Sequence, residues 1–111
     1  MREVESSAVL TNLQLIPALR EFKRKVAKKY GIERMILFGS HVSGKTGNDV
    51  DLLIVARRKE NLMSELYHEW HSVQKMNYPV DFVCYTPEEF ERLRKQVSLV
   101  RDATNQGVEI W

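Results

Sequence analysis

Four consecutive apolar residues, Leu52 to Val55, follow directly on two aspartates, Asp49 and Asp51. A run without polar alternation is typical of a strand buried on both faces, so we expect it at the centre of a sheet. Residues two apart on a strand point to the same face, which puts both carboxylates at the mouth of that strand. Hydrophobic burial gives no reason for such a pair. The placement therefore indicates a cation site.

A second apolar run lies upstream and predicts another buried strand, Arg34 to Phe38, which ends at Gly39 and Ser40. A glycine at such a turn lets an anion approach the backbone closely, and a serine adds a hydroxyl donor. Gly-Ser pairs are common in turns, so the pair gains meaning only from its position next to the acids. Together the two features suggest a phosphate site beside a metal site.

The rest of the chain predicts helices around a third strand, Val80 to Tyr85, which alternates in polarity. Apolar spacing and capping residues predict helices over Pro17 to Tyr30, Glu60 to Met76, a segment that starts at Thr86, and Leu99 to Thr104. A terminal edge strand is expected within Val108 to Trp111. This order describes one compact sheet with helices packed against it.

Asp81 places a charge within the otherwise core-like third strand. An unpaired charge in a protein interior costs several kcal/mol, so we expect Asp81 to have a cationic partner. The partner is either a lysine or arginine, or a metal shared with Asp49 and Asp51. Magnesium is the natural ion for carboxylates combined with substrate phosphates.

Length and composition limit the number of domains and the classes of protein to which the chain can belong. At 111 residues the chain predicts one domain, over 17–111, after a variable lead-in over 1–16. Its single cysteine, Cys84, excludes an internal disulfide and a cysteine-based zinc site. Without a long apolar run we expect no membrane span and a cytoplasmic protein. A net charge of +2 is mild, but the first helix carries a basic face that is either simply solvated or meets an acidic partner or RNA.

The ordered set of motifs resembles the minimal nucleotidyltransferases of the DNA polymerase beta-like superfamily. The matching residues are Leu37-Phe38-Gly39-Ser40, Asp49-Val50-Asp51-Leu52-Leu53, Pro79-Val80-Asp81-Phe82-Val83, Thr86-Pro87-Glu88-Glu89-Phe90 and Gly107-Val108-Glu109-Ile110. The resemblance implies an α+β (α/β) nucleotidyltransferase fold, a short mixed sheet flanked by helices in a single domain. It spans most of the chain, from Pro17 to Trp111.

The resemblance implies transfer of a nucleoside monophosphate, AMP from ATP, to a hydroxyl acceptor. Asp49, Asp51 and Asp81 would be catalytic and would hold two Mg²⁺ ions, and Gly39 and Ser40 would bind the triphosphate. Two features depart from the family pattern: the loop between Ser40 and Asp49 is about two residues shorter than usual, and an arginine common after the serine is absent. Lys45 is expected to bind the nucleotide and to supply the positive charge of the absent arginine.

The acceptor has three interpretations. Minimal members that resemble this chain commonly act as antitoxins beside a HEPN-domain ribonuclease toxin, and some transfer AMP to a toxin tyrosine. The first interpretation is thus an adenylyltransferase antitoxin with a HEPN partner. The second is a catalytically silent antitoxin that only binds its toxin, and the third is a small RNA-end nucleotidyltransferase. The two tryptophans, Trp70 and Trp111, are expected to be core or interface residues, and aromatic residues are common enough at interfaces to suggest homo- or hetero-oligomerisation.

Overall fold

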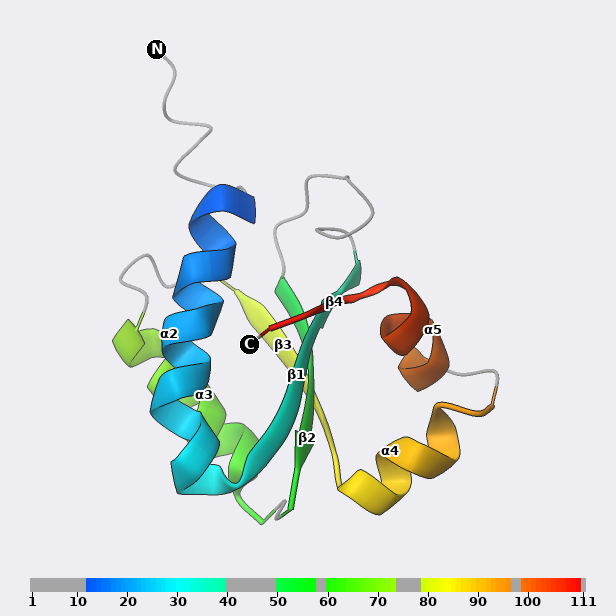
Figure 1. Ribbon diagram of the computed structural model, residues 1–111. Coiled ribbons are helices and arrows are strands. Elements are labelled where there is room, and N and C mark those ends of the chain that lie inside the picture. Colours follow the sequence, from blue (N-terminus) through cyan, green and yellow to red (C-terminus); the bar gives the residue numbers. More distant parts are fainter. Residues whose placement is uncertain (1–11, 40–49, 58–59, 74–78, 97–98, 111) are drawn as a thin grey trace.

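The computed structural model describes residues 12–39, 50–57, 60–73, 79–96 and 99–110, which form one mixed sheet between two layers of helices (Figure 1). The elements are α2 (Asn12–Tyr30), β1 (Ile32–Phe38), β2 (Val50–Ala56), α3 (Leu62–Val73), β3 (Val80–Tyr85), α4 (Pro87–Leu93), α5 (Leu99–Gln106) and β4 (Val108–Glu109). Helices α2 and α3 cover one face of the sheet, and α4 and α5 cover the other. Among these described segments, no helix is long and apolar enough to cross a membrane.

The sheet has the strand order β3-β2-β1-β4. Strand β1 runs antiparallel to β2 and β4, whereas β2 runs parallel to β3. The expected mixed sheet is therefore confirmed, with the uninterrupted apolar run of β2 inside the sheet and the last strand at its edge. Every residue of β2 from Leu52 to Ala56 is buried.

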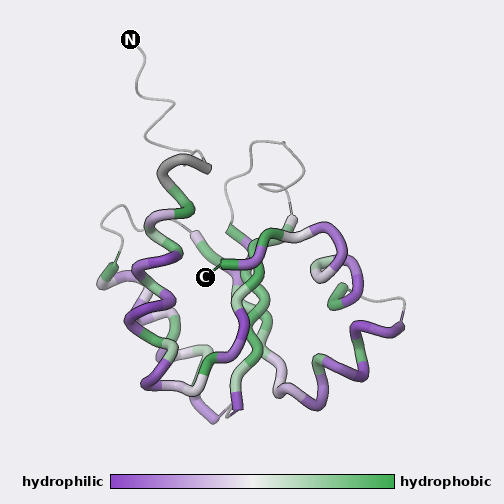
Figure 2. Tube along the Cα trace, viewed as in Figure 1, coloured by the Kyte–Doolittle hydropathy of each residue, from purple (hydrophilic) through white to green (hydrophobic). Residues whose placement is uncertain are grey.

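The hydrophobic core is divided by the sheet into two clusters. Between the sheet and α2 and α3, Trp70 is fully buried and its ring meets Phe22 edge to face, with centroids 5.4 Å apart. On the other face, Phe90 of α4 packs with Val100 of α5 and with Leu53 and Val55 of β2. Figure 2 shows the consequence, with apolar strands at the centre and polar residues along the outer helix faces.

The first helix begins at Asn12, and the expected start at Pro17 is wrong. Proline commonly opens a helix because it lacks a backbone N–H, but here Pro17 lies inside α2. Leu15 is fully buried in the larger core cluster, so burial of its side chain anchors the additional turn. Tertiary packing has outweighed the local preference of the proline.

Other boundaries differ by a few residues from those expected. Strand β1 begins earlier, at Ile32, and α5 continues to Gln106. Helix α3 begins at Leu62 because Asn61 has a left-handed backbone with a φ of 57°, and the expected last turn over 74–76 lies outside the described residues. The predicted start of α4 is confirmed: the Thr86 hydroxyl accepts from the Glu89 N–H, and the Glu89 carboxylate accepts from the Thr86 N–H.

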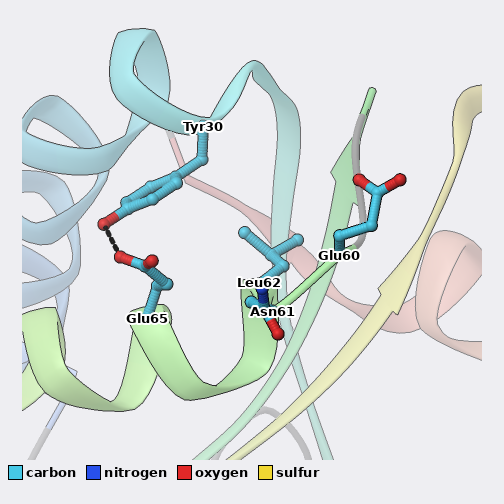
Figure 3. A pocket seen from close by; sticks show the side chains of 5 residues that line it. All are labelled: Tyr30, Glu60, Asn61, Leu62 and Glu65. Carbon is cyan, nitrogen blue, oxygen red and sulfur yellow. Dashed lines mark hydrogen bonds between the residues drawn. The ribbon is translucent and has the colours of Figure 1, made fainter.

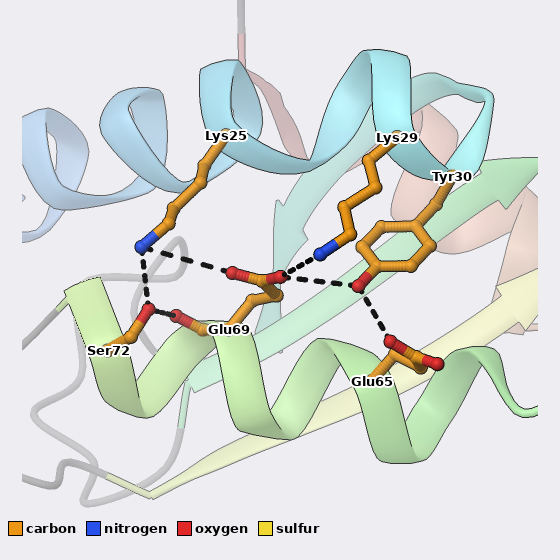
Figure 4. A network of polar contacts seen from close by, with 6 residues as sticks. All are labelled: Lys25, Lys29, Tyr30, Glu65, Glu69 and Ser72. Carbon is orange, nitrogen blue, oxygen red and sulfur yellow. Dashed lines mark hydrogen bonds and ion pairs between the residues drawn. The ribbon is translucent and has the colours of Figure 1, made fainter.

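A polar network joins α2 to α3 across the outer side of the larger core cluster (Figure 4). The buried carboxylate of Glu69 accepts from Lys29 Nζ at 3.0 Å and from the Tyr30 hydroxyl at 3.2 Å. The same hydroxyl approaches Glu65 Oε1 at 2.8 Å, and Lys25 Nζ lies 3.9 Å from Glu69 Oε1. Lys25 and Lys29, which belong to the basic face predicted for the first helix, thus bind Glu69 of α3 within the fold.

Replacing Glu69 with glutamine is expected to destabilise the protein by about 1–3 kcal/mol at neutral pH, because a charged acceptor of a partly buried network is lost. Hydrogen bonding from Lys29 is the main cause that holds the pKa of Glu69 below its ordinary value of 4.5. This stabilisation is present above pH 4.5 and disappears as the pH falls through the lower pKa of the folded state. Urea unfolding from pH 7 to pH 3 measures both effects.

The matched control is Glu65→Gln, which changes an exposed carboxylate bonded to the same tyrosine. It should cost less stability, and the acid-dependent loss seen in the wild-type protein should remain. If the free energy of unfolding depended on pH equally in the wild-type protein and in Glu69→Gln, the acid-dependent loss of stability would not come from Glu69.

Candidate active site

Two of the three predicted acids, Asp51 and Asp81, lie next to each other on neighbouring strands. Strands β2 and β3 pair in parallel with Asp51 opposite Asp81, and β1 pairs with β2 so that Phe38 lies opposite Asp51. Opposed residues of neighbouring strands point to the same face of a sheet, at strand spacings of about 4.8 Å. The two carboxylate-bearing residues therefore share one face at one end of the sheet.

Gly39 follows β1 directly, next to this pair. Its φ of 86° is a left-handed conformation, which favours glycine. A Cβ atom added to Gly39 would overlap Oδ2 of Asp51 and lie 3.2 Å from Asp51 Cγ. The glycine thus brings its backbone against the Asp51 carboxylate, so that the predicted phosphate cradle and the predicted metal site are contiguous.

The acid pair lies on the sheet face covered by α4 and α5. Asp51 shares its side of β2 with Leu53 and Val55, which pack in the smaller core cluster. The two helices contact this face further along the strands, with α5 against β1 and α4 against β2 and β3. Asp51 remains partly exposed and Asp81 is exposed. A substrate can thus reach this end of the sheet.

The exposure of Asp81 corrects one expectation. We expected an interior charge that burial would force to find a cation, but β3 is an outer strand and Asp81 is open to solvent. In the described part of the chain no lysine or arginine pairs with it. Asp81 is a candidate site residue because it lies opposite Asp51 on the neighbouring strand, and not because it is buried.

A family model described as the nucleotidyltransferase domain matches residues 19–109. The chain belongs to this family. The matched range includes Gly39, Asp51 and Asp81. No curated protein matches the chain.

Two solved structures share the fold. One is a chain in the crystal structure of a point mutant of the toxin–antitoxin MntA–HpeT, with 21% identity and a TM-score of 0.56, covering 86% of this chain and 70% of that one. The other is a candidate nucleotidyltransferase from Sulfolobus solfataricus solved at 1.40 Å resolution, with 19% identity and a TM-score of 0.56, covering 97% of this chain and 85% of that one. At these identities the likeness concerns the fold.

Three further predicted residues of the nucleotidyltransferase site, Ser40, Lys45 and Asp49, lie outside the described residues. Within the ranges that are described, no group of three His, Cys, Asp or Glu side chains is arranged to hold a metal. The described pair, Asp51 and Asp81, supplies hard carboxylate oxygens, which fit Mg²⁺. Asp49 precedes Val50, the first residue of β2, and the assignment of a third ligand to it stays a prediction.

Arg34 is a cation on the same sheet face that sequence reasoning did not single out. It lies on β1, and its guanidinium binds both carboxylate oxygens of Glu109 on β4, at 3.0 and 2.6 Å, while stacking 4.9 Å from the Phe90 ring. This contact holds the pKa of Glu109 below its ordinary value. Because the guanidinium is engaged by Glu109, Arg34 serves to fasten the last strand to β1.

A pocket of about 270 Å³ lies at the opposite end of the sheet, between the end of α2 and the start of α3 (Figure 3). It is lined by Tyr30, Glu60, Asn61, Leu62 and Glu65. Its two carboxylates, Glu60 and Glu65, lie far from Gly39 of the predicted phosphate cradle, which approaches Asp51 at the other end of the sheet.

Proposed function

We propose that this nucleotidyltransferase domain transfers AMP from ATP to a hydroxyl group of a partner protein, and that it is the antitoxin of a HEPN-domain toxin whose tyrosine is the acceptor. The observation that carries the proposal is the contiguity of Gly39, Asp51 and Asp81 on one sheet face. The structural likeness to a chain of the toxin–antitoxin MntA–HpeT supports the antitoxin role. We place this activity in the cytoplasm and in a complex with the toxin.

Each residue has a distinct part in the proposed reaction. Asp49, Asp51 and Asp81 would hold two Mg²⁺ ions, which supply charge neutralisation on the triphosphate when bound. The backbone at Gly39 and the hydroxyl of Ser40 would bind the outer phosphates, assisted by Lys45. Asp81, which is exposed, would accept the proton of the acceptor hydroxyl as its oxygen attacks the α-phosphorus and pyrophosphate leaves. Catalysis would depend mainly on positioning and charge, as in other phosphoryl-group transfers.

The test is incubation of the chain with labelled ATP, CTP, GTP or UTP and Mg²⁺, alone, with RNA, or with the protein product of the neighbouring reading frame. Label from ATP on a tyrosine of that protein is the expected result. Inhibition of the toxin without any nucleotide, and equally by Asp51→Asn, would show that the chain is a binding-only antitoxin. Label on RNA would overturn the protein acceptor.

An RNA acceptor is the second candidate, and one observation favours it. Arg20, Arg24 and Lys28 are exposed at four-residue spacing on the side of α2 opposite its buried residues, and they have no partner among the described residues. Such a row could contact phosphates, in which case binding of a single-stranded RNA would weaken steeply with salt. Substitution of all three by glutamine should then abolish RNA labelling. Unchanged RNA labelling would exclude this role for the row.

A further inference from the structure

Strand β3 is an outer strand of the sheet, and in the described part of the chain it pairs only with β2. Its face toward α2 and α3 is covered, since Val80 and Phe82 are buried in the larger core cluster. Its lateral edge is a different surface, made of backbone groups. An edge strand presents a row of N–H and C=O groups that can pair with another chain.

The pairing with β2 determines which backbone groups of β3 point outward. The Val50 N–H donates to the Pro79 carbonyl at 3.1 Å, so the backbone groups of Pro79 are turned toward β2. Backbone groups of successive residues on a strand point alternately to its two sides. The N–H and C=O groups of Val80 and Phe82 are therefore directed away from β2, toward the open edge.

The register of the acid pair continues to this edge. Phe38, Asp51 and Asp81 lie opposite one another on three adjacent strands. A strand added beyond β3 would place its own residue opposite Asp81, about 4.8 Å further along the same row. Side chains of opposed residues point to the same face, so that residue would project beside the exposed carboxylate of Asp81.

We propose that the acceptor is an extended, hydroxyl-bearing segment of the partner protein that adds to β3 as a fifth strand, with its hydroxyl residue opposite Asp81. The proposal rests on the transferase activity proposed above. Backbone pairing with Val80 and Phe82 would fix the segment, and register would choose the residue that is modified. Among the candidate acceptors a polypeptide fits this edge, because RNA has no backbone amides to pair with it.

The chemical step balances without a further reactant. The acceptor oxygen forms a bond to the α-phosphorus while the bond from that phosphorus to the bridging oxygen of pyrophosphate breaks. The hydroxyl proton passes to the carboxylate of Asp81 and from there to solvent. The products are the nucleotidylated hydroxyl segment and pyrophosphate.

The test uses the wild-type chain in every arm and varies only the acceptor. The probes are pools of seven-residue peptides with a central tyrosine and random flanks that contain no serine, threonine or tyrosine, incubated with labelled ATP and Mg²⁺, and the neighbouring toxin is a further arm. One pool is N-methylated at the tyrosine and at the residues two before and two after it. A second is N-methylated at the residues directly before and after the tyrosine, and a third has phenylalanine in place of tyrosine.

Only one of the two N-methylated pools should lose labelling, by about tenfold or more, because only alternate amides of an added strand face β3. The phenylalanine pool should take no label. Equal labelling of both N-methylated pools, or labelling of the neighbouring toxin without any labelled tyrosine peptide, would overturn strand addition and leave the transferase intact. Absence of label in every arm, the toxin included, would overturn the proposed function and this inference with it.

Hydrogen exchange of the free protein provides a second check on the edge. The Phe82 amide should exchange faster than the Val83 amide, because the latter faces β2. Exchange of the Phe82 amide should slow when an accepting tyrosine peptide is bound. A Phe82 amide that is already protected in the free protein would show that the edge is covered and would overturn the proposal.

Discussion

Asp51→Asn is expected to reduce nucleotide transfer by about a hundredfold or more while the protein remains folded. The asparagine keeps the size of the side chain but removes the negative charge at the point where β2 meets both Gly39 and Asp81. Without that charge the remaining acids should bind Mg²⁺ and the triphosphate poorly. Labelled-nucleotide transfer at saturating Mg²⁺ measures the loss, and circular dichroism with thermal melting reports the fold.

Asp102→Asn is the matched control, because Asp102 is an exposed aspartate on α5 and not on the row that joins Phe38, Asp51 and Asp81. It should leave transfer within about twofold, since a surface charge change away from the site has little effect on stability or chemistry. Full transfer by Asp51→Asn would remove Asp51 from the metal site and would leave the proposed mechanism without its central residue.

The parts of the fold that the sequence predicts well are those determined by local pattern. Strand β3 has the predicted bounds, Val80 to Tyr85, because its alternation matches a sheet with one well-covered face. The start of α4 is also correct, since the Thr86 cap and Glu89 act within four residues of each other. The start of α2 could not be predicted in this way. It depends on a long-range contact of Leu15 with the core, against the local preference of Pro17.

For the candidate site, local pattern likewise predicts which residues take part but not how they are arranged. Alternation along one strand and the family resemblance were enough to nominate Asp51, Gly39 and Asp81 from the sequence. Their arrangement needs the pairing of strands that are far apart in the chain, and a sequence pattern does not determine that register. The exposure of Asp81 was predicted wrongly for this reason, because β3 is an outer strand and Asp81 is exposed where the pattern predicted burial.

Gly39→Ala is expected to lower transfer by about a hundredfold, through displacement of Asp51. The added methyl group would overlap Oδ2 of Asp51, and the φ of 86° at this position is unfavourable for alanine. Relief of the overlap requires either the carboxylate or the backbone after β1 to move. The strained backbone should also reduce stability by about 1–2 kcal/mol. Transfer assays and urea unfolding on the same preparation separate the two effects.

Gly31→Ala separates backbone strain from the contact with Asp51. Gly31 also has a left-handed backbone, with a φ of 67°, but a Cβ atom there would lie 3.6 Å from Arg57 Cβ, an ordinary contact distance. It lies between α2 and β1, at the end of the sheet away from the acids. The variant should therefore lose a similar amount of stability and keep its transfer activity. If both glycine variants lost activity equally, strain would be the cause, and the close approach of Gly39 to Asp51 would have no special part in catalysis.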